Sequence, residues 1–145
     1  VEATGPISIQ LWISSSALDT DFTAKLLDIY PPSSDYPEGY ALNLTDGILR
    51  AKFHSSWSEP ELLEPGKIYP ITVRLYPTSN LFAKGHRIRL DISSSNFPRF
   101  DVNGNTGENP ALSSVKITAQ NSVYHDVQHP SHLILPVIPD YGCLE

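Results

Sequence analysis

Residues 85–107 read GHRIRLDISSSNFPRFDVNGNTG, a strand pattern followed by a long polar segment. In the first half, apolar and charged residues alternate, so that Ile88, Leu90 and Ile92 share one face of an extended chain. A period of two with one apolar face predicts a β-strand that packs on the core. From Ser93 onward, Ser, Asn, Pro, Asp and Gly predominate, and these residues favour turns, so we expect a long ordered loop after the strand.

The same alternation recurs along the chain. It predicts strands over residues 5–13, 68–76 and 115–119, with an apolar run at 133–138, and loops at 31–39, 55–66, 77–85 and 124–132. Thirteen prolines and eight glycines interrupt the chain often, which favours short strands over long helices. Seven or eight strands without a βαβ rhythm predict an all-β protein, an antiparallel β-sandwich or jelly roll.

Two segments allow alternatives. Residues 19–30 fit a strand, but Asp19 could also cap a helix with Phe22, Leu26 and Ile29 on one face; neighbouring strands favour the strand. Residues 40–53 contain Asp46-Gly47, which fits either the turn of a β-hairpin or an irregularity in one bulged strand.

Composition limits the class of protein. The chain has 145 residues and a formal net charge of -6, which suits one domain and argues against a nucleic-acid partner. No apolar run reaches the roughly 20 residues of a transmembrane helix, so we expect no membrane partner. Cys143 is the single cysteine, which excludes an internal disulfide.

The ends of the chain suggest a piece of a longer product. The sequence contains no methionine and begins at Val1 with a strand-like segment. We therefore expect a single β-sandwich domain over residues 1–143, and the last two residues, 144–145, fit either a cloning scar or natural sequence.

Histidines cluster near the end of the chain. His125, His129 and His132 lie within eight residues, together with Asp126 and Ser131. This group could be a metal site or a hydrolytic Ser-His pair. Pro130 breaks any regular presentation to a metal, and the members of a catalytic triad usually meet only through the fold, so a hydrogen-bonded loop is the favoured interpretation.

A second candidate metal site lies in the polar loop. Asp101, Asn103 and Asn105 match the first three oxygen ligands of a calcium loop. Thr106 then replaces the required glycine, and Leu112 replaces the required glutamate. We therefore expect Asx-turns that shape the loop, and neither a metal nor another cofactor.

Two tryptophans and one missing motif bear on function. Trp12 and Trp57 could form a sugar-binding platform, so a carbohydrate-binding module is the alternative function. The G-x-S-x-G motif of α/β-hydrolase nucleophiles does not occur in the sequence. We therefore assign no catalytic residue in this chain.

The order of these runs resembles the C-terminal β domain of the X-Pro dipeptidyl-peptidase and cocaine-esterase type acyl hydrolases. The resemblance rests on four segments, GPISIQLWISSSALDTDFTAKLLDI, DGILRAKF, IYPITVRLYPTSNLFAKGHRIRLDISSSNFPRFDVNGNTG and VYHDVQHPSHLILPVIP. It implies a jelly-roll, galactose-binding-like sandwich, and it favours a strand over 19–30. It also implies a non-catalytic accessory domain, since the family's catalytic Ser, Asp and His lie in a preceding α/β-hydrolase domain.

The resemblance implies a partner as well. The domain is expected to pack on the α/β-hydrolase domain of the same chain and to help frame its substrate entrance. The candidate residues for this inter-domain surface lie in three loops: Asp19, Asp21, Phe22, Asn96, Phe97, Arg99, Phe100, Asp101, Asn103, Asn105, His125, His129 and His132. The family's domain usually starts before the point that matches Val1, so opening strands are expected to be missing and an exposed sheet edge to promote self-association.

Overall fold

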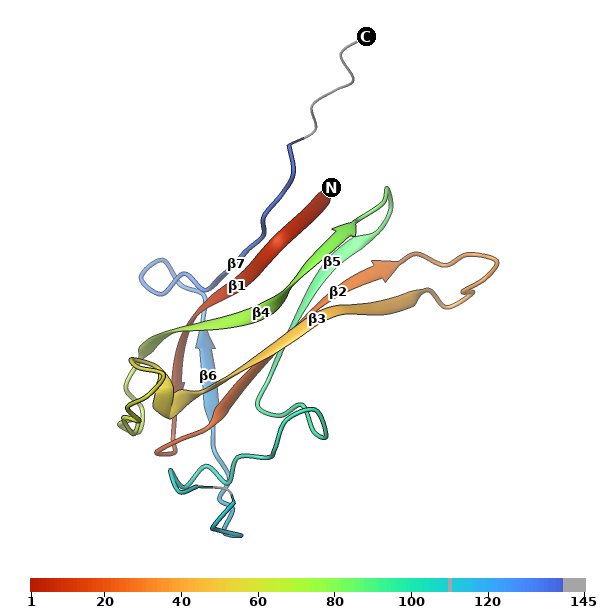
Figure 1. Cartoon of the computed structure of the whole chain (residues 1–145). Helices are drawn as coiled ribbons and strands as arrows, with labels where there is room; N and C mark the ends of the chain where they lie inside the picture. Colours follow the sequence, from red (N-terminus) through yellow and green to blue (C-terminus); the bar gives the residue numbers. More distant parts are fainter. Residues whose placement is uncertain (110, 140–145) are drawn as a thin grey trace.

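Two antiparallel sheets pack face to face in the computed structural model, which describes residues 1–109 and 111–139 (Figure 1). Cys143 and residues 144–145 lie outside this range. The elements are β1 (Glu2–Ser15), β2 (Asp21–Tyr30), β3 (Tyr40–Arg50), the short 3-10 helix η1 (Ala51–Phe53), β4 (Tyr69–Leu81), β5 (Arg87–Ser93), β6 (Asn121–Tyr124) and β7 (His132–Ile134). The predicted all-β antiparallel sandwich is confirmed, and the jelly-roll arrangement stays a prediction.

The first sheet is built around β1. This strand pairs with β4 on one side and with β6 and β7 in succession on the other. Its alternating residues Ile7, Ile9, Leu11 and Ile13 are all buried, as the sequence period predicts. The β1 strand therefore supplies much of the core that both sheets share.

The second sheet has the order β3-β2-β5. The predicted strand over residues 19–30 is confirmed as β2. The strand that opens residues 85–107 is β5, and it lies at the edge of its sheet instead of in the core. Leu90 and Ile92 pack against the core, whereas Ile88 is 41% exposed, because within the described residues β5 pairs with β2 alone.

On one side of the sandwich the two sheets touch at β3 and β4. Thr45 donates a hydrogen bond from Oγ1 to the carbonyl oxygen of Tyr76, at 2.8 Å. A Cβ built on Gly47 would lie only 2.2 Å from the carbonyl oxygen of Arg74. Gly47 therefore permits a close approach of two strands. It does not form a hairpin turn, and β3 is one strand whose pairing with β2 is shifted between Leu26 and Leu27.

Two further expectations are corrected. β4 continues through Pro77 to Leu81, where a loop was predicted; the irregular pairing between Gly5 and Ile7 of β1 accommodates the proline. Residues 115–119 form no strand, although their sequence alternates. The backbone of Ile117 donates to the carbonyl oxygen of Gly104 at 3.0 Å, so this segment pairs with a loop instead of a sheet.

Helical structure contributes little to the described part of the chain. Among residues 1–109 and 111–139, no helix has both the length and the apolar character needed to span a bilayer.

Candidate functional site

Among the described residues, the longest segment without regular structure is the β5–β6 loop, residues 94–109 and 111–120, at one end of the sandwich (Figure 1). It contains seven of the residues predicted to form an inter-domain surface. Polar contacts from several strands hold it in place.

A buried acidic pair forms the first anchor. Asp19, just before β2, and Asp21, its first residue, are both almost fully buried. Asn103 of the loop donates from Nδ2 to Asp19 Oδ2 at 3.1 Å and to Asp21 Oδ1 at 2.8 Å. One amide group therefore bridges two carboxylates that lie more than eighty positions away in sequence.

Two basic residues from the end of β3 and from η1 balance these carboxylates. Arg50 donates from Nε and Nη2 to the two oxygens of Asp21, at 3.0 and 3.2 Å. This hydrogen-bonded pairing raises the pKa of Arg50, with the Asp21 charge adding to the effect. Lys52 donates its backbone N–H to Asp19 Oδ1 at 2.9 Å, and its Nζ reaches the carbonyl oxygen of Gly107 at 3.1 Å. The cluster is thus neutralised and tied to the loop at a second point.

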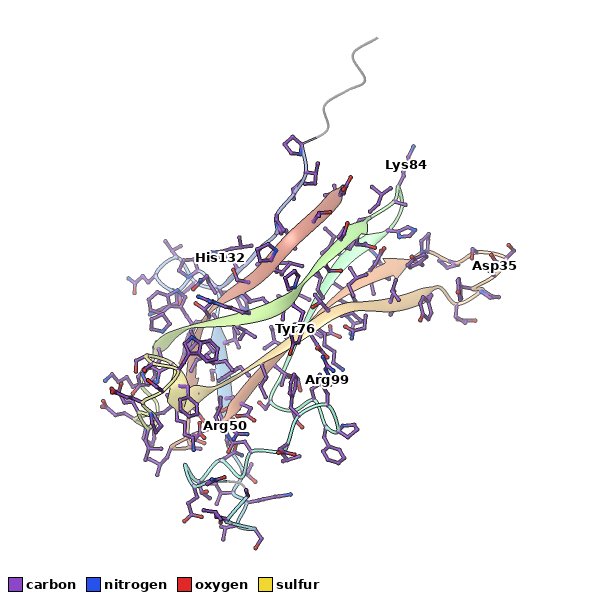
Figure 2. All side chains as sticks on the ribbon, in the orientation of Figure 1. Asp35, Arg50, Tyr76, Lys84, Arg99 and His132 are labelled. Carbon is purple, nitrogen blue, oxygen red and sulfur yellow. The ribbon has the colours of Figure 1, made fainter. Side chains whose placement is uncertain are left out.

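A second anchor lies over the side where β3 meets β4. Asn96 and Arg99 both donate to the carboxylate of Asp46 on β3, each at 3.2 Å. The guanidinium of Arg99 also lies 5.8 Å from the centre of the Tyr76 ring, and both residues are labelled in Figure 2. It lies 5.7 Å from the centre of the Phe100 ring. These contacts hold the first turn of the loop against both sheets.

The far half of the loop folds back on itself. The amide of Asn105 donates to the carbonyl oxygen of Ile117 at 2.8 Å, and its backbone N–H donates to Asn103 Oδ1 at 2.9 Å. The second bond is the Asx-turn expected from the sequence. A Cβ built on Gly104 would lie only 2.4 Å from the carbonyl oxygen of Val115, so the backbone approaches closely at this point. The two limbs of the loop are therefore in contact.

Apolar side chains project from this anchored loop into solvent. Phe97 is 70% exposed and Leu112 is 86% exposed, with Val102 and Val115 also exposed. Together with Asp101 they line a shallow hollow of about 800 Å³. A fixed backbone that presents several exposed apolar side chains is typical of a surface that another protein surface covers.

The histidines form a hydrogen-bonded turn. The backbone N–H groups of Gln128 and His129 donate to Asp126 Oδ1 at 2.8 and 2.9 Å, and His129 Nδ1 lies 3.0 Å from the same carboxylate. His132 contacts the carbonyl oxygen of Pro130 through Nδ1 at 2.7 Å. Across residues 1–109 and 111–139, no three His, Cys, Asp or Glu side chains are grouped as metal ligands would be.

These hydrogen bonds lower the pKa of Asp126, chiefly through the His129 side chain and then through the two backbone N–H groups. Because the folded-state pKa is depressed, the stabilisation of the turn is present above the ordinary carboxyl pKa and is lost as pH falls through the lower folded value. We expect the Asp126 carboxyl carbon to titrate by NMR below an ordinary aspartate, and the shift to become smaller in His129→Ala, which removes the imidazole and keeps both backbone N–H groups. An ordinary titration in the unaltered protein would contradict this.

The two tryptophans differ in exposure. Trp12 is half-buried because the His129 ring covers it edge-on, with centroids 5.1 Å apart. Trp57 is 69% exposed and borders a separate hollow of about 360 Å³ with Gln10, Thr72 and Arg74. A carbohydrate platform would therefore depend on Trp57.

The predicted surface residues divide into three sets. Asp19, Asp21, Phe22 and Asn103 are buried within this chain, where Phe22 belongs to the core. Asn96, Arg99, Phe100 and Asn105 orient the loop by internal contacts. Phe97, Asp101, His125 and His132 are exposed, and His129 is half-buried under Trp12 and Tyr124. The available surface is consequently narrower than the sequence suggested.

Sequence reasoning missed the basic half of the buried cluster and the most exposed apolar residue of the loop. Arg50 and Lys52 flank Ala51 in an otherwise apolar run. Two basic residues in a segment that is otherwise suited to the core were the only sequence signal for a buried charge cluster. Leu112 was considered only as a mismatch in a calcium loop. Its neighbours carry no helical or strand period, so nothing marked it as part of a surface.

The described residues form an antiparallel β-sandwich that carries an anchored loop with exposed apolar side chains. The chain belongs to the family of X-Pro dipeptidyl-peptidase C-terminal non-catalytic domains, whose model matches residues 1–134.

Relatives of known name agree with this assignment. The chain is 45% identical over 140 residues to the cocaine esterase of Rhodococcus sp. (strain MB1 Bresler), covering 95% of this chain and 23% of that protein. A putative serine esterase of Mycobacterium bovis (strain ATCC BAA-935 / AF2122/97) is 31% identical over 157 residues, covering 95% of this chain and 22% of that protein.

Solved structures share the fold. An α-amino acid ester hydrolase aligns with a TM-score of 0.84 at 29% identity, covering 94% of this chain and 23% of that one. An aminopeptidase from a marine sediment Thaumarchaeota archaeon also gives 0.84, at 25% identity, covering 95% and 24%. This chain therefore spans about a quarter of the length of the proteins that it matches.

Proposed function

We propose that this chain acts as the non-catalytic accessory domain of a longer serine hydrolase, of the acyl esterase or X-Pro dipeptidyl-peptidase type. It packs on the α/β-hydrolase domain through the exposed part of the β5–β6 loop and helps to frame the substrate entrance. Family membership supports the accessory role, and the names of the relatives support hydrolysis as the reaction of the longer protein.

The observation that carries this proposal is the contrast within the β5–β6 loop. Its inner side is fixed to both sheets by Asn96, Arg99 and Asn103, whereas its outer side exposes Phe97 and Leu112. A loop that only connects two strands needs neither this buried charge network nor large apolar tips. A loop that presents a preformed surface to another domain requires both, since order in advance reduces the entropy lost on docking.

The chain by itself is expected to be inert. Incubating it with a chromogenic acyl ester and with an X-Pro anilide should give no turnover above buffer, because hydrolysis by an acyl-enzyme route needs a nucleophile, a base and an oxyanion site from another domain. Turnover that co-purifies with the chain and is abolished by substitution within it would overturn the accessory role.

The docking surface is tested in the longer polypeptide. We expect Leu112→Lys to lower its free energy of unfolding by about 2–3 kcal/mol, because a buried leucine contact is lost and an ammonium is desolvated. Leu81→Lys is the matched control, since Leu81 is 66% exposed at the far end of β4. Neither substitution should change the thermal unfolding of the 145-residue chain alone. Equal effects of the two substitutions in the longer polypeptide would place the docking surface elsewhere.

A further inference from the structure

The buried anchor residue Asn103 is followed directly by a glycine, and it is the only one of the seven asparagines in the sequence that is. An asparagine side chain loses ammonia when the backbone nitrogen of the next residue attacks its Cγ, which is one reason why asparagine is a thermolabile residue. Glycine has no side chain to hinder this attack, and its backbone is conformationally permissive. Asn103–Gly104 is therefore the position in this chain where the reaction meets the least local resistance.

The folded loop holds the Asn103 side chain at both of its polar atoms. Nδ2 donates to Asp19 Oδ2 at 3.1 Å and to Asp21 Oδ1 at 2.8 Å, and Oδ1 accepts the backbone N–H of Asn105 at 2.9 Å. During the attack, negative charge develops on the backbone nitrogen and then on the side-chain oxygen. Two buried carboxylates within hydrogen-bonding distance of the side chain oppose that charge, so the closed loop slows the reaction.

The backbone of Gly104 is confined as well. A Cβ built on this residue would lie 2.4 Å from the carbonyl oxygen of Val115, and the Gly104 carbonyl oxygen accepts the backbone N–H of Ile117 at 3.0 Å. Closing a ring between Asn103 and Gly104 turns the peptide unit that joins them, which these contacts resist. The reaction therefore requires a local opening of the loop, and its rate follows the population of the opened loop.

We propose that Asn103–Gly104 is a deamidation site of this chain, gated by opening of the β5–β6 loop. The backbone nitrogen of Gly104 gives up its proton and bonds to Asn103 Cγ, the Cγ–Nδ2 bond breaks, and Nδ2 leaves with that proton as ammonia. Water then adds to either carbonyl of the resulting cyclic imide. The product is aspartate or isoaspartate at position 103.

Conversion removes the contact that kept the loop closed. The amide donates to both carboxylates, whereas the product is a third carboxylate beside Asp19 and Asp21, which are almost fully buried. Without a donor, these carboxylates lose hydrogen bonds and gain a like charge, so the loop does not close again as before. Opening promotes conversion and conversion promotes opening, which makes the step one-way. A weaker attachment to the hydrolase domain would follow as well, and that consequence alone rests on the proposed function.

Peptide mapping of the longer polypeptide tests the site without reference to docking. After incubation at mildly alkaline pH, trypsin digestion at mildly acidic pH releases residues 100–116, because Arg99 and Lys116 bound this segment. Fragmentation of the peptide separates Asn103 from Asn105 and Asn109. We expect Asn103 to convert before any other asparagine of this chain, and at least about tenfold more slowly than in a synthetic peptide of residues 100–116, where nothing holds the loop closed.

Asp46→Ala loosens the loop and leaves Asn103 and its hydrogen-bond partners in place. It removes the acceptor of Asn96 and Arg99, whose bonds of 3.2 Å hold the first turn of the loop. Conversion of Asn103 should become at least about tenfold faster, since bonds to a charged group are lost and the opened loop is more populated. Asp35→Ala makes the same change in the exposed β2–β3 loop and should leave the rate unaltered. Urea unfolding of each variant verifies that the fold is intact during incubation.

The converted fraction can be separated by anion exchange, because it carries an additional negative charge. Limited proteolysis should cut its β5–β6 loop sooner than the same loop of the unconverted fraction. Earlier conversion of another asparagine of this chain would overturn the proposal, and so would conversion of Asn103 as fast as in the synthetic peptide. An unchanged rate in Asp46→Ala, or equal protease resistance of the two fractions, would also contradict it. None of these outcomes depends on whether the loop docks on another domain.

Discussion

Gly47→Ala is expected to destabilise the protein by about 3 kcal/mol or more, the upper range for an overpacked interior. The new Cβ would lie 2.2 Å from the carbonyl oxygen of Arg74 and 3.0 Å from a methyl group of Leu75. The obstacle is backbone, so a change of rotamer cannot relieve it, and β3 and β4 must separate where they close the sandwich. Denaturant unfolding followed by tryptophan fluorescence measures the loss.

Gly66→Ala is the matched control. Gly66 has a φ of 82°, and nothing lies within 4 Å of the position that a Cβ would take, so only the left-handed backbone opposes the substitution. That conformation costs an alanine about 1 kcal/mol. A loss for Gly47→Ala no larger than the loss for Gly66→Ala would mean that β3 and β4 do not approach each other so closely.

Asn103→Leu is expected to cost about 3 kcal/mol or more, since it removes two hydrogen bonds to buried carboxylates that are each worth about 1.5–3 kcal/mol. Asp19 and Asp21 would lose the amide that bridges them, while leucine offers no donor. The β5–β6 loop would also lose its inner anchor, so limited proteolysis should cut it sooner. Asn43→Leu, at an exposed position of β3, is the control.

Asn103→Asp separates hydrogen bonding from packing, because the two side chains have nearly the same size. A third carboxylate beside Asp19 and Asp21 would have a raised pKa, from burial and from like charge. Its destabilising effect is therefore full above that pKa and declines as pH falls through it, when the protonated group can donate. A stability difference from the unaltered protein that does not shrink toward acid pH would contradict this account.

Several elements were predictable because their pattern is local. The buried residues of β1 alternate as the sequence does, since only one face of this strand meets the other sheet. β2 was ambiguous for a physical reason. Phe22, Thr23 and Ala24 are all buried, and Thr23 donates a hydrogen bond to the carbonyl oxygen of Ser93 at the end of β5, so no alternation of buried and exposed residues remains to be recognised.

The candidate site was less predictable than the strands. Asn103 was noted because it matches a ligand position of a calcium loop. In the structure its side-chain amide donates hydrogen bonds to the carboxylates of Asp19 and Asp21. Asp46 was noted only as part of a signal for a hairpin turn or a bulged strand, although it anchors Asn96 and Arg99, about fifty positions away. Contacts across such separations leave no regular spacing in the sequence.

The order of side chains along the chain was enough to specify extended backbone, the antiparallel β class and the family resemblance, because each depends on neighbours within a few residues. Only the packed structure assigned β5 to an edge, Gly47 to a crossing of strands and the Asp19–Asp21 pair to the interior. Those outcomes depend on which distant segments meet and exclude water, and pairing and burial of that kind are properties of the folded chain as a whole.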